Sequence, residues 1–345
     1  MKAIRIHQHG NLDQLRIDDV PIPRIRPNEV LLEVKSTSLN HLDLWVRNGI
    51  PGVTLPLPMI LGSDASGVVK ETGEWVKGVH DGDRVLVVPG YGCGKCEECF
   101  SGRENFCSDY AIRGEHGDGV QAEYMAIDSH QILPMPSNIS FDEGASIPLV
   151  YLTAWEMLVN KARIQPWHTI LVWSASSGVG SAAVQIAKLF GARVFTTAGG
   201  PEKVAKARQL LEADAVIDYQ TQDVVKEIRG LTRGRGADVV VDHVGAATWE
   251  KSLRSLAKGG KLVFCGATTG PTVSFDLRFV FFKQQSILGS TMGDRADLIK
   301  VLKFVEVGKL RGLVDRTFVI EAIRDAHGYL ESGKQFGKVI VRIAR

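Results

Sequence analysis

The pattern of apolar and polar residues changes near residue 150. Before this point, short apolar runs are separated by turns rich in proline and glycine. Runs of this kind predict β-strands joined by long loops. We therefore expect residues 1–150 to form a mostly β domain, largely antiparallel or barrel-like. Its clearest predicted strands are residues 29–36, 66–73, 83–90 and 123–127.

From about residue 151, apolar runs of strand length alternate with helical patterns. Strands that are apolar on both faces and alternate with helices indicate a parallel sheet covered on both sides. We therefore predict an α/β domain with a doubly wound parallel sheet over residues 151–292. Residues 293–345 are expected to contribute a helix and a strand that return to the first domain. The predicted strands of the sheet are residues 169–175, 192–198, 214–219, 238–245, 261–267 and 283–291, with helices at 181–191, 202–212, 223–232 and 248–257.

The composition excludes several classes of function. The chain has 345 residues, a formal net charge of +2 and 44% hydrophobic residues. Such a weak charge does not favour nucleic acid or an acidic membrane surface as a partner. The longest mostly apolar stretch, residues 147–159, is too short to span a bilayer, and the N-terminus lacks the pattern of a signal peptide. We expect a cytoplasmic protein with no membrane partner.

Four of the five cysteines lie in one short stretch, at positions 93, 96, 99 and 107. Disulfides are disfavoured in a reducing cytosol, whereas this spacing suits four thiolates around one tetrahedral zinc. Four thiolates leave no position for water or substrate, so such a zinc is structural. We predict one structural zinc bound by Cys93, Cys96, Cys99 and Cys107, and an inert thiol at Cys265.

A glycine-containing turn, Ser174 to Gly180, follows the first strand of the predicted sheet. This is where a dinucleotide-binding fold places its G-x-G-x-x-G motif, and here the motif is modified. Backbone N–H groups at the start of the next helix are expected to bind a pyrophosphate. The residues concerned are Ser177, Gly178, Val179 and Gly180.

The end of the second strand indicates which cofactor binds. An NAD-specific site usually has Asp or Glu there, but this strand ends in Ala198 and Gly199, and Lys203 follows. Tyr219, at the end of the third strand, is expected to reach the same pocket. This pattern favours NADPH. The alternative is that Lys203 is an ordinary solvated lysine on a helix.

The sequence resembles the medium-chain dehydrogenase/reductase superfamily over essentially its whole length. The cysteine cluster is similar to the structural-zinc lobe of its alcohol dehydrogenases. The stretches SASSGVGSAAVQIAKLFGA and SLNHLDLWVRNG are closer to its quinone oxidoreductases. The resemblance implies a GroES-like catalytic domain, a Rossmann dinucleotide domain with the active site between them, and a homodimer or homotetramer. By position it also implies cofactor contacts from Asn40, Thr153, His243, Val244, Gly266, Ala267, Leu288, Gly289 and Ser290.

The chain departs from the zinc-dependent members at the catalytic metal. The three ligand positions of that pattern fall on Asn40, Ser63 and Leu149. Asparagine is a poor zinc ligand, serine is unusual and leucine cannot coordinate a metal. The sequence therefore predicts that the catalytic zinc has been lost. One alternative stays open, in which His41, Asp64 and His116 form an atypical zinc site.

Without a Lewis acid, reduction of an activated double bond is easier than oxidation of an alcohol, because hydrogen bonds can stabilise an enolate. We predict an NADPH-dependent reductase of enones or quinones acting on a small-molecule substrate. Two alternatives remain, namely an alcohol dehydrogenase with the atypical zinc site and a non-catalytic NADPH-binding protein. The candidate catalytic residues are Asn40, His41, Asp64 and Trp45, although Trp45 is equally well explained as a core residue. Asp43 and Asp64 could instead cap turns or pair with Arg47 or Arg84.

Overall fold

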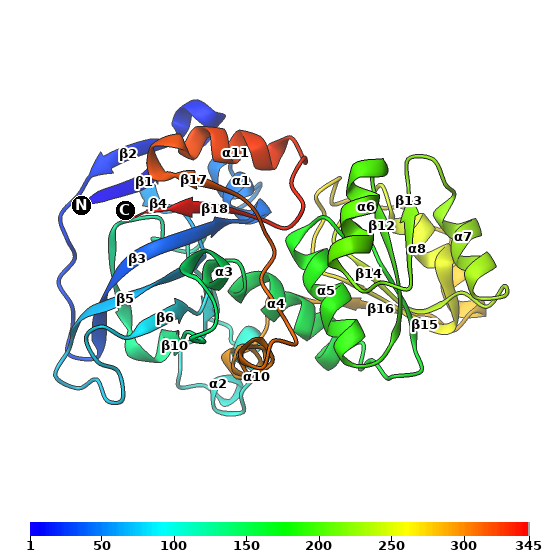
Figure 1. Cartoon of the computed structure of the whole chain (residues 1–345), viewed down its shortest axis with the longest axis horizontal. Coiled ribbons are helices and arrows are strands. Elements are labelled where there is room, and N and C mark those ends of the chain that lie inside the picture. The colour runs from blue at the N-terminus through cyan, green and yellow to red at the C-terminus, as the bar shows by residue number, and fades with distance from the viewer. Residues whose placement is uncertain (344–345) are drawn as a thin grey trace. The chain divides into compact units, whose positions relative to one another are not determined.

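The computed structural model describes residues 1–343, and residues 344–345 of the predicted C-terminal segment lie outside this range. The chain divides into two compact units (Figure 1). The first contains Met1–Leu149 and Gly293–Arg345, and the second contains Val150–Met292. Among the described residues, no helix has the length and apolar character needed to cross a membrane.

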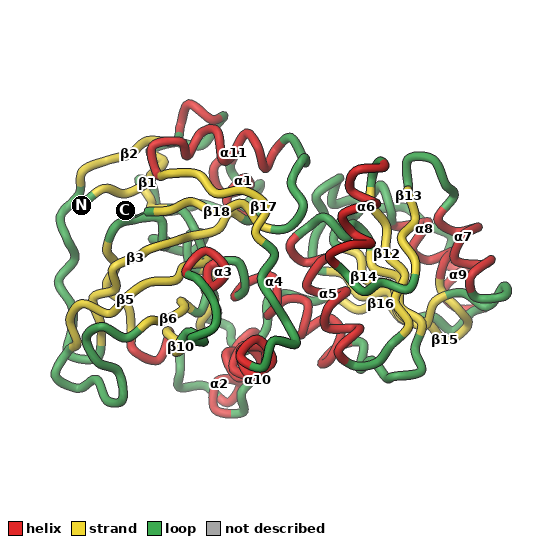
Figure 2. The backbone as a smooth tube through the Cα atoms, viewed as in Figure 1, coloured by secondary structure: helices red, strands yellow, loops and turns green. Residues whose placement is uncertain are grey.

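The first unit is built mainly from strands (Figure 2). Its largest sheet has the strand order β10-β6-β5-β3-β18-β17. Strand β9 pairs with the first residues of β3, from Glu29 to Glu33. Strand β18 pairs antiparallel with β3, so the C-terminal segment completes the sheet begun by the N-terminal half. These strands are β3 (Glu29–Leu39), β5 (Asp64–Thr72), β6 (Arg84–Val87), β9 (Tyr124–Asp128), β10 (Ile132–Pro134), β17 (Val314–Val319) and β18 (Lys338–Arg342).

Smaller sheets and short helices complete this unit. A three-stranded sheet has the order β2-β1-β4, and β7 pairs with β8 beside the cysteine cluster. Alternate residues of β3 are buried, including Val30, Leu32 and Val34, which accounts for the alternation seen in the sequence. The elements are β1 (Lys2–Ile6), β2 (Arg16–Asp19), β4 (Met59–Ile60), β7 (Gly90–Tyr91), β8 (Ala111–Ile112), α1 (His41–Asn48), α2 (Glu97–Phe100), α3 (Phe141–Ala145), α10 (Arg295–Glu306) and α11 (Ile323–Glu331).

The second unit is a six-stranded parallel sheet with the order β13-β12-β11-β14-β15-β16. Helices α5 and α6 cover one face and α7 and α8 the other (Figure 1), as right-handed crossovers from a central strand require. The strands are β11 (Thr169–Val172), β12 (Arg193–Ala198), β13 (Ala215–Asp218), β14 (Ala237–Asp242), β15 (Leu256–Phe264) and β16 (Ser286–Gly289). The helices are α5 (Gly178–Leu189), α6 (Pro201–Leu210), α7 (Val224–Leu231), α8 (Trp249–Ser255) and α9 (Leu277–Phe282), while α4 (Pro148–Trp155) runs across the boundary between the units.

The predicted fold class is confirmed in both units. The six predicted strands of the parallel sheet all form, and strand β11 is buried at every position, as its continuous apolar run implied. The sequence patterns did not predict α1, α11 or β17. Each of these mixes polar and apolar residues in a short segment, and their formation depends on packing against the larger sheet.

Candidate functional site

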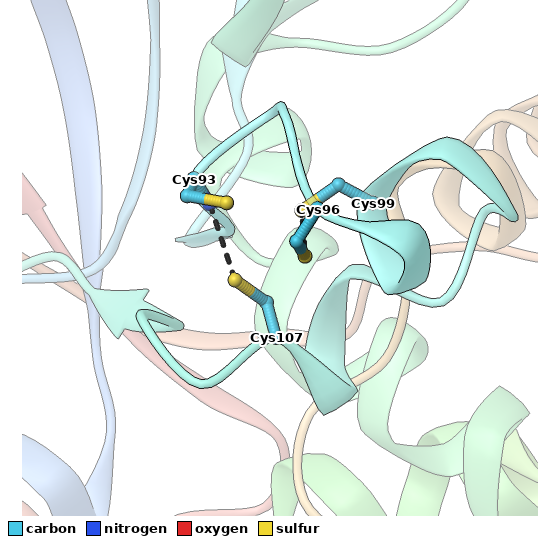
Figure 3. Close-up of side chains that lie close together, drawn as sticks. All are labelled: Cys93, Cys96, Cys99 and Cys107. Atoms are coloured by element: carbon cyan, nitrogen blue, oxygen red, sulfur yellow. Dashed lines mark hydrogen bonds between the residues drawn. The ribbon is translucent and has the colours of Figure 1, made fainter.

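The four clustered cysteines converge on one point in the first unit (Figure 3). Their sulfur atoms all lie within 4.8 Å of one another. A tetrahedral zinc with Zn–S bonds of about 2.3 Å separates its sulfurs by about 3.8 Å, so the four thiols fit this ion. Backbone N–H groups also point at the sulfurs: Cys93 N lies 3.3 Å from Cys107 Sγ, and Gly94 N lies 3.3 Å from Cys99 Sγ. Such N–H groups stabilise thiolates, the form that binds metal.

The cysteine loop requires glycine at Gly92. A Cβ atom at this position would lie 2.6 Å from Cys99 Sγ, inside the cluster. The loop is also attached to the start of α10, because Asn105 N donates to Asp294 Oδ1 at 3.2 Å and Arg295 lies 3.9 Å from Glu104. The cluster therefore joins a loop of the first half of the chain to the segment that re-enters this unit after residue 292.

A second group of polar side chains forms where three neighbouring strands end. The register pairs Ser38 of β3 with Asp64 of β5, and Leu39 of β3 with Val339 of β18. This register brings Asn40, Asp64 and Lys338 to one end of the sheet, although Asn40 and Lys338 are 298 residues apart in sequence. All three side chains are buried, with exposures of 7%, 0% and 4%. We call Asn40, Asp64 and Lys338 the lysine cluster.

Hydrogen bonds occupy both carboxylate oxygens of Asp64. Its Oδ1 accepts the backbone N–H of Leu149 at 2.8 Å. Its Oδ2 accepts from Ser38 Oγ at 3.1 Å, Asn40 Nδ2 at 2.9 Å and Lys338 Nζ at 3.3 Å. Lys338 Nζ also donates to Asn40 Oδ1, the one atom of that side chain able to bind a metal. The cluster is thus satisfied internally, and the ammonium compensates the charge of Asp64.

Asp43 lies beside the lysine cluster and is 1% exposed. Its Oδ2 accepts the backbone N–H of Asn40 at 2.7 Å, so it caps the start of α1. Burial raises the pKa of Asp43 to about 7, while Lys338 acts in the opposite direction. Burial also lowers the pKa of His41, and the nearby Lys338 lowers it further. His41 is therefore a neutral imidazole at neutral pH. It can donate a hydrogen bond, but it is not a protonated imidazolium ready to act as a general acid.

The residues of the expected metal positions do not form a zinc site. The Ser63 hydroxyl donates to the carbonyl of Arg113 at 2.7 Å. His116 Nδ1 accepts the backbone N–H of Ile112 at 3.2 Å. His41, Asp64 and His116 are not among the groups of described residues whose ligand atoms lie within 4.8 Å of one another. The geometry does not support the atypical zinc site left open by the sequence.

The pairing of Asp64 with an arginine is wrong, because its cationic partner is Lys338. Arg47 instead bonds His327 and Glu331 of α11, and Arg84 donates to the carbonyl of Ile139. Capping was the correct alternative for Asp43. Trp45, on α1, is 38% exposed and so is not an ordinary core tryptophan.

The glycine-containing turn of the second unit has the geometry of a phosphate-binding helix start. Ser177 precedes α5, and its Oγ accepts the N–H of Gly180 at 2.8 Å. A Cβ atom on Gly180 would lie 2.1 Å from the carbonyl oxygen of Ser174, so only glycine allows this close approach. Ser174 itself has a positive φ of 53°. The turn leaves N–H groups at the start of a twelve-residue helix, where an anion is stabilised.

Several other predicted cofactor residues gather at the carboxyl ends of the parallel strands. His243 Nε2 lies 2.7 Å from Ser177 Oγ, which joins the loop after β14 to the turn after β11. A Cβ on Gly266 would lie 3.0 Å from the carbonyl of His243, so the loops after β14 and β15 are in close contact. Of the remaining predicted positions, Leu288 and Gly289 end β16, and Thr153 lies in α4. The others lie in the loops that follow β14, β15 and β16, namely Val244, Ala267 and Ser290.

The pocket predicted for the adenosine ribose contains an acid that the sequence analysis missed. Lys203 Nζ lies 3.4 Å from Ser176 Oγ, beside the phosphate turn. A Cβ on Gly199 would lie 2.4 Å from Tyr219 Oη, so these residues are neighbours as expected. Asp218, at the end of β13, accepts the N–H of Gly200 at 3.0 Å. In the sequence, the predicted strand 214–219 ends in Asp218 and Tyr219, and this acidic residue at a strand end could have revealed it.

Asp242 is a second residue that sequence reasoning missed. It ends β14, is fully buried, and accepts the N–H groups of Val244 and Gly245 at 2.9 and 3.1 Å. The hydroxyls of Thr248 and Ser252 also donate to it, at 2.8 and 2.6 Å. These bonds hold the loop after β14 in place, so Asp242 positions His243 rather than contacting a ligand itself.

Comparison with known proteins agrees with these features. Residues 26–137 match the alcohol dehydrogenase GroES-like domain, and residues 178–307 match the zinc-binding dehydrogenase family. A crystal structure of an NAD-dependent alcohol dehydrogenase is 44% identical, covers 100% of both chains and has a TM-score of 0.96. An NAD-dependent alcohol dehydrogenase of Sulfurisphaera tokodaii is 30% identical over 99% of both chains. An acryloyl-coenzyme A reductase of Metallosphaera sedula is also 30% identical, over 99% of both chains.

The chain belongs to the medium-chain dehydrogenase/reductase superfamily. It is therefore an oxidoreductase, and the family implies a pyridine nucleotide cofactor and zinc. The close glycine turn and the open start of α5 fit a dinucleotide, and the cysteine cluster fits a structural zinc. The lysine cluster does not fit the catalytic zinc of the superfamily, because Asn40 Oδ1 and Asp64 Oδ2 already accept hydrogen bonds from an ammonium group and Asp64 Oδ1 accepts the N–H of Leu149.

Proposed function

We propose that this superfamily member is an NADPH-dependent reductase of a carbon–carbon double bond conjugated to a carbonyl group, or of a quinone, acting without a catalytic zinc. The lysine cluster carries this proposal. A divalent cation bound to Asn40 Oδ1 or Asp64 Oδ2 would have to displace the Lys338 ammonium or lie beside it. Like charges at that distance repel strongly in a buried environment.

Hydrogen-bond donors can replace a metal in this type of reaction. The bound cofactor supplies a hydride to the β-carbon, and negative charge then develops on the carbonyl oxygen of the substrate. Fixed donors aimed at that oxygen stabilise an enolate by a few kcal/mol in a site that excludes water. The residues we assign to this role are Asn40, which retains one amide hydrogen after bonding Asp64, and the neutral imidazole of His41.

The names of relatives support two different activities. The acryloyl-coenzyme A reductase reduces, by its name, an activated double bond, and it is as similar in sequence as the archaeal alcohol dehydrogenase. The alcohol dehydrogenases support the alternative activity, and the solved structure among them is the more similar at 44% identity. We favour the reductase because an alcohol dehydrogenase of this superfamily needs a metal to stabilise an alkoxide.

Lys203 and Tyr219 support NADPH as the cofactor. Lys203 adds positive charge beside the phosphate turn, and the Tyr219 hydroxyl packs closely against Gly199. Asp218 argues against NADPH, because a carboxylate repels a 2′-phosphate and accepts hydrogen bonds from the ribose hydroxyls of NADH. One of its oxygens, Oδ1, is occupied by the N–H groups of Gly200 and Gln220, both at 3.0 Å. We therefore assign the greater weight to Lys203.

The test combines metal content and turnover on one preparation. We expect one zinc per chain, oxidation of NADPH with enones, enoyl thioesters or quinones, and very slow oxidation of primary alcohols. The matched variant is Cys96→Ser, which removes a ligand from the cysteine cluster and leaves the lysine cluster unchanged. Two zincs per chain together with fast alcohol oxidation would contradict the proposal and favour the alcohol dehydrogenase. Nucleotide binding without turnover of any of these substrates would favour the non-catalytic alternative.

A further inference from the structure

Lys338 is an unusual residue for its position. It begins β18, is 4% exposed, and is followed by three apolar residues that are all fully buried. Burying a lysine is unfavourable unless its ammonium group is paired and hydrogen-bonded. Its pairing with Asp64 and Asn40 is therefore specific, and it involves the residue that replaces the first metal ligand.

The contacts of Lys338 determine how the Asn40 amide is oriented. An asparagine amide can be rotated by half a turn with little change in shape, which exchanges its donor and acceptor. Here Lys338 can only donate, so it requires Oδ1 on its side, and the Asp64 carboxylate can only accept, so it requires Nδ2 on the other. With both partners present a single orientation satisfies all the bonds. The second N–H of Nδ2 has no acceptor among the described residues and remains available.

We propose that Lys338 is a positioning residue that holds the Asn40 amide with its free N–H directed to a bound ligand, in place of a metal ion at this point. This inference deepens the proposed function and rests on it for the identity of the ligand, a substrate or nicotinamide-ribose oxygen. Lys338 does not itself contact the reacting atoms in this proposal. Its hydrogen bond to Asn40 Oδ1 selects the amide orientation.

The first experiment compares kcat, KM and thermal stability in four variants. Lys338→Met removes the cation and leaves Asp64 buried without a counter-charge, so we expect both stability and kcat to fall. The double variant Lys338→Met/Asp64→Asn removes both charges and should regain most of the stability. It should still show kcat lowered about tenfold or more, with little change in the KM for NADPH, because the amide is no longer oriented. Lys338→Arg, which keeps the charge, should retain more activity than Lys338→Met.

The matched control is Lys35→Met, which removes a lysine of the same sheet whose side chain is 25% exposed and lies 2.8 Å from Glu33. We expect its kcat to equal that of the parent. If the double variant regained kcat together with stability, Lys338 would have a structural role only and the proposal would be wrong.

A second readout does not depend on turnover. The side-chain amide protons of Asn40, assigned by their loss in Asn40→Ala, should give two distinct and exchange-protected NMR signals in the parent. We expect those signals to shift and lose protection in the double variant and to stay unchanged in Lys35→Met. Unchanged signals in the double variant would refute the positioning role. If the parent reduced no enone, thioester or quinone, the proposed function would fail while this measurement still decided the role of Lys338.

Discussion

Reversal of one charge beside the phosphate turn should reverse the cofactor preference. Lys203 is half-buried at the start of α6, and its Nζ lies 3.4 Å from Ser176 Oγ. We expect Lys203→Glu to weaken NADPH binding strongly and NADH binding only slightly. The reason is that the 2′-phosphate, which only NADPH carries, would then face a negative charge.

The size of the effect follows from Coulomb's law. Two unit charges about 4 Å apart interact by about 1 kcal/mol in bulk water and about 4 kcal/mol at the effective dielectric near a protein surface. For a half-buried lysine we take about 1–2 kcal/mol, and reversal of the charge doubles this to about 2–4 kcal/mol. The dissociation constant of NADPH should then rise by about 30-fold to several hundred-fold.

The assay is fluorescence titration of NADPH and NADH at two salt concentrations. High salt should reduce the difference between the parent and Lys203→Glu, since screening weakens a partly exposed pair. Lys206→Glu is the matched control, because Lys206 lies on the same helix and pairs with Glu202 at 3.3 Å. Equal affinities for the two cofactors in the parent, or an equal loss in both variants, would refute the reasoning.

Three further predictions concern stability and assembly. Cys96→Ser should reduce bound zinc to well below one per chain and lower the melting temperature. Cys265→Ser should leave both unchanged, because Cys265 lies outside the cluster and burial raises the pKa of its thiol to about 12. Normal zinc content in Cys96→Ser would disprove the assignment. Burial, followed by the charge of Arg47, lowers the pKa of His327 from 6.5 to about 3. The contribution of neutral His327 to the free energy of unfolding is therefore complete above about pH 6.5. It is lost as the pH falls toward 3, at about 1.4 kcal/mol per pH unit. Denaturation between pH 7.5 and 5 should show a flatter pH dependence for His327→Gln than for the parent, and parallel curves would argue against this. Finally, β16 is an edge strand, and the α9 residues Phe281 and Phe282 before it are 59% and 70% exposed. We propose that a second copy covers this edge, so Phe281→Glu/Phe282→Glu should lower the mass measured by light scattering, and an unchanged mass would count against it.

Local patterns were sufficient to predict most of the second unit. Its central strands β11 and β14 are buried on both faces, so each appears as a continuous apolar run that is recognisable without knowledge of its neighbours. The cysteine cluster was predictable for a similar reason. All four ligands lie within residues 93–107, and the chain needs only to turn tightly to bring them together.

The short elements of the first unit and the polar cluster were not predictable in this way. The sequence indicated that Asn40 is a poor zinc ligand, that Ser63 is an unusual one and that Leu149 cannot coordinate a metal, but it did not show which group pairs with Asp64. Lys338 lies 298 residues after Asn40, in a segment whose pattern predicted only a strand. Its role depends on which strand β18 pairs with and in which register, because a shift of one residue would turn its side chain to the opposite face.

The sequence by itself determined most helices and strands of the second unit, the dinucleotide turn and the cysteine cluster, because each depends on residues close together in the chain. The tertiary structure alone decided that an ammonium group from the last strand compensates Asp64 and orients Asn40. It also decided that Asp43 caps the start of α1 and that Asp218 lies beside Gly200. The physical reason is that a buried charge is stable only with a partner, and packing of distant segments determines which partner lies within reach.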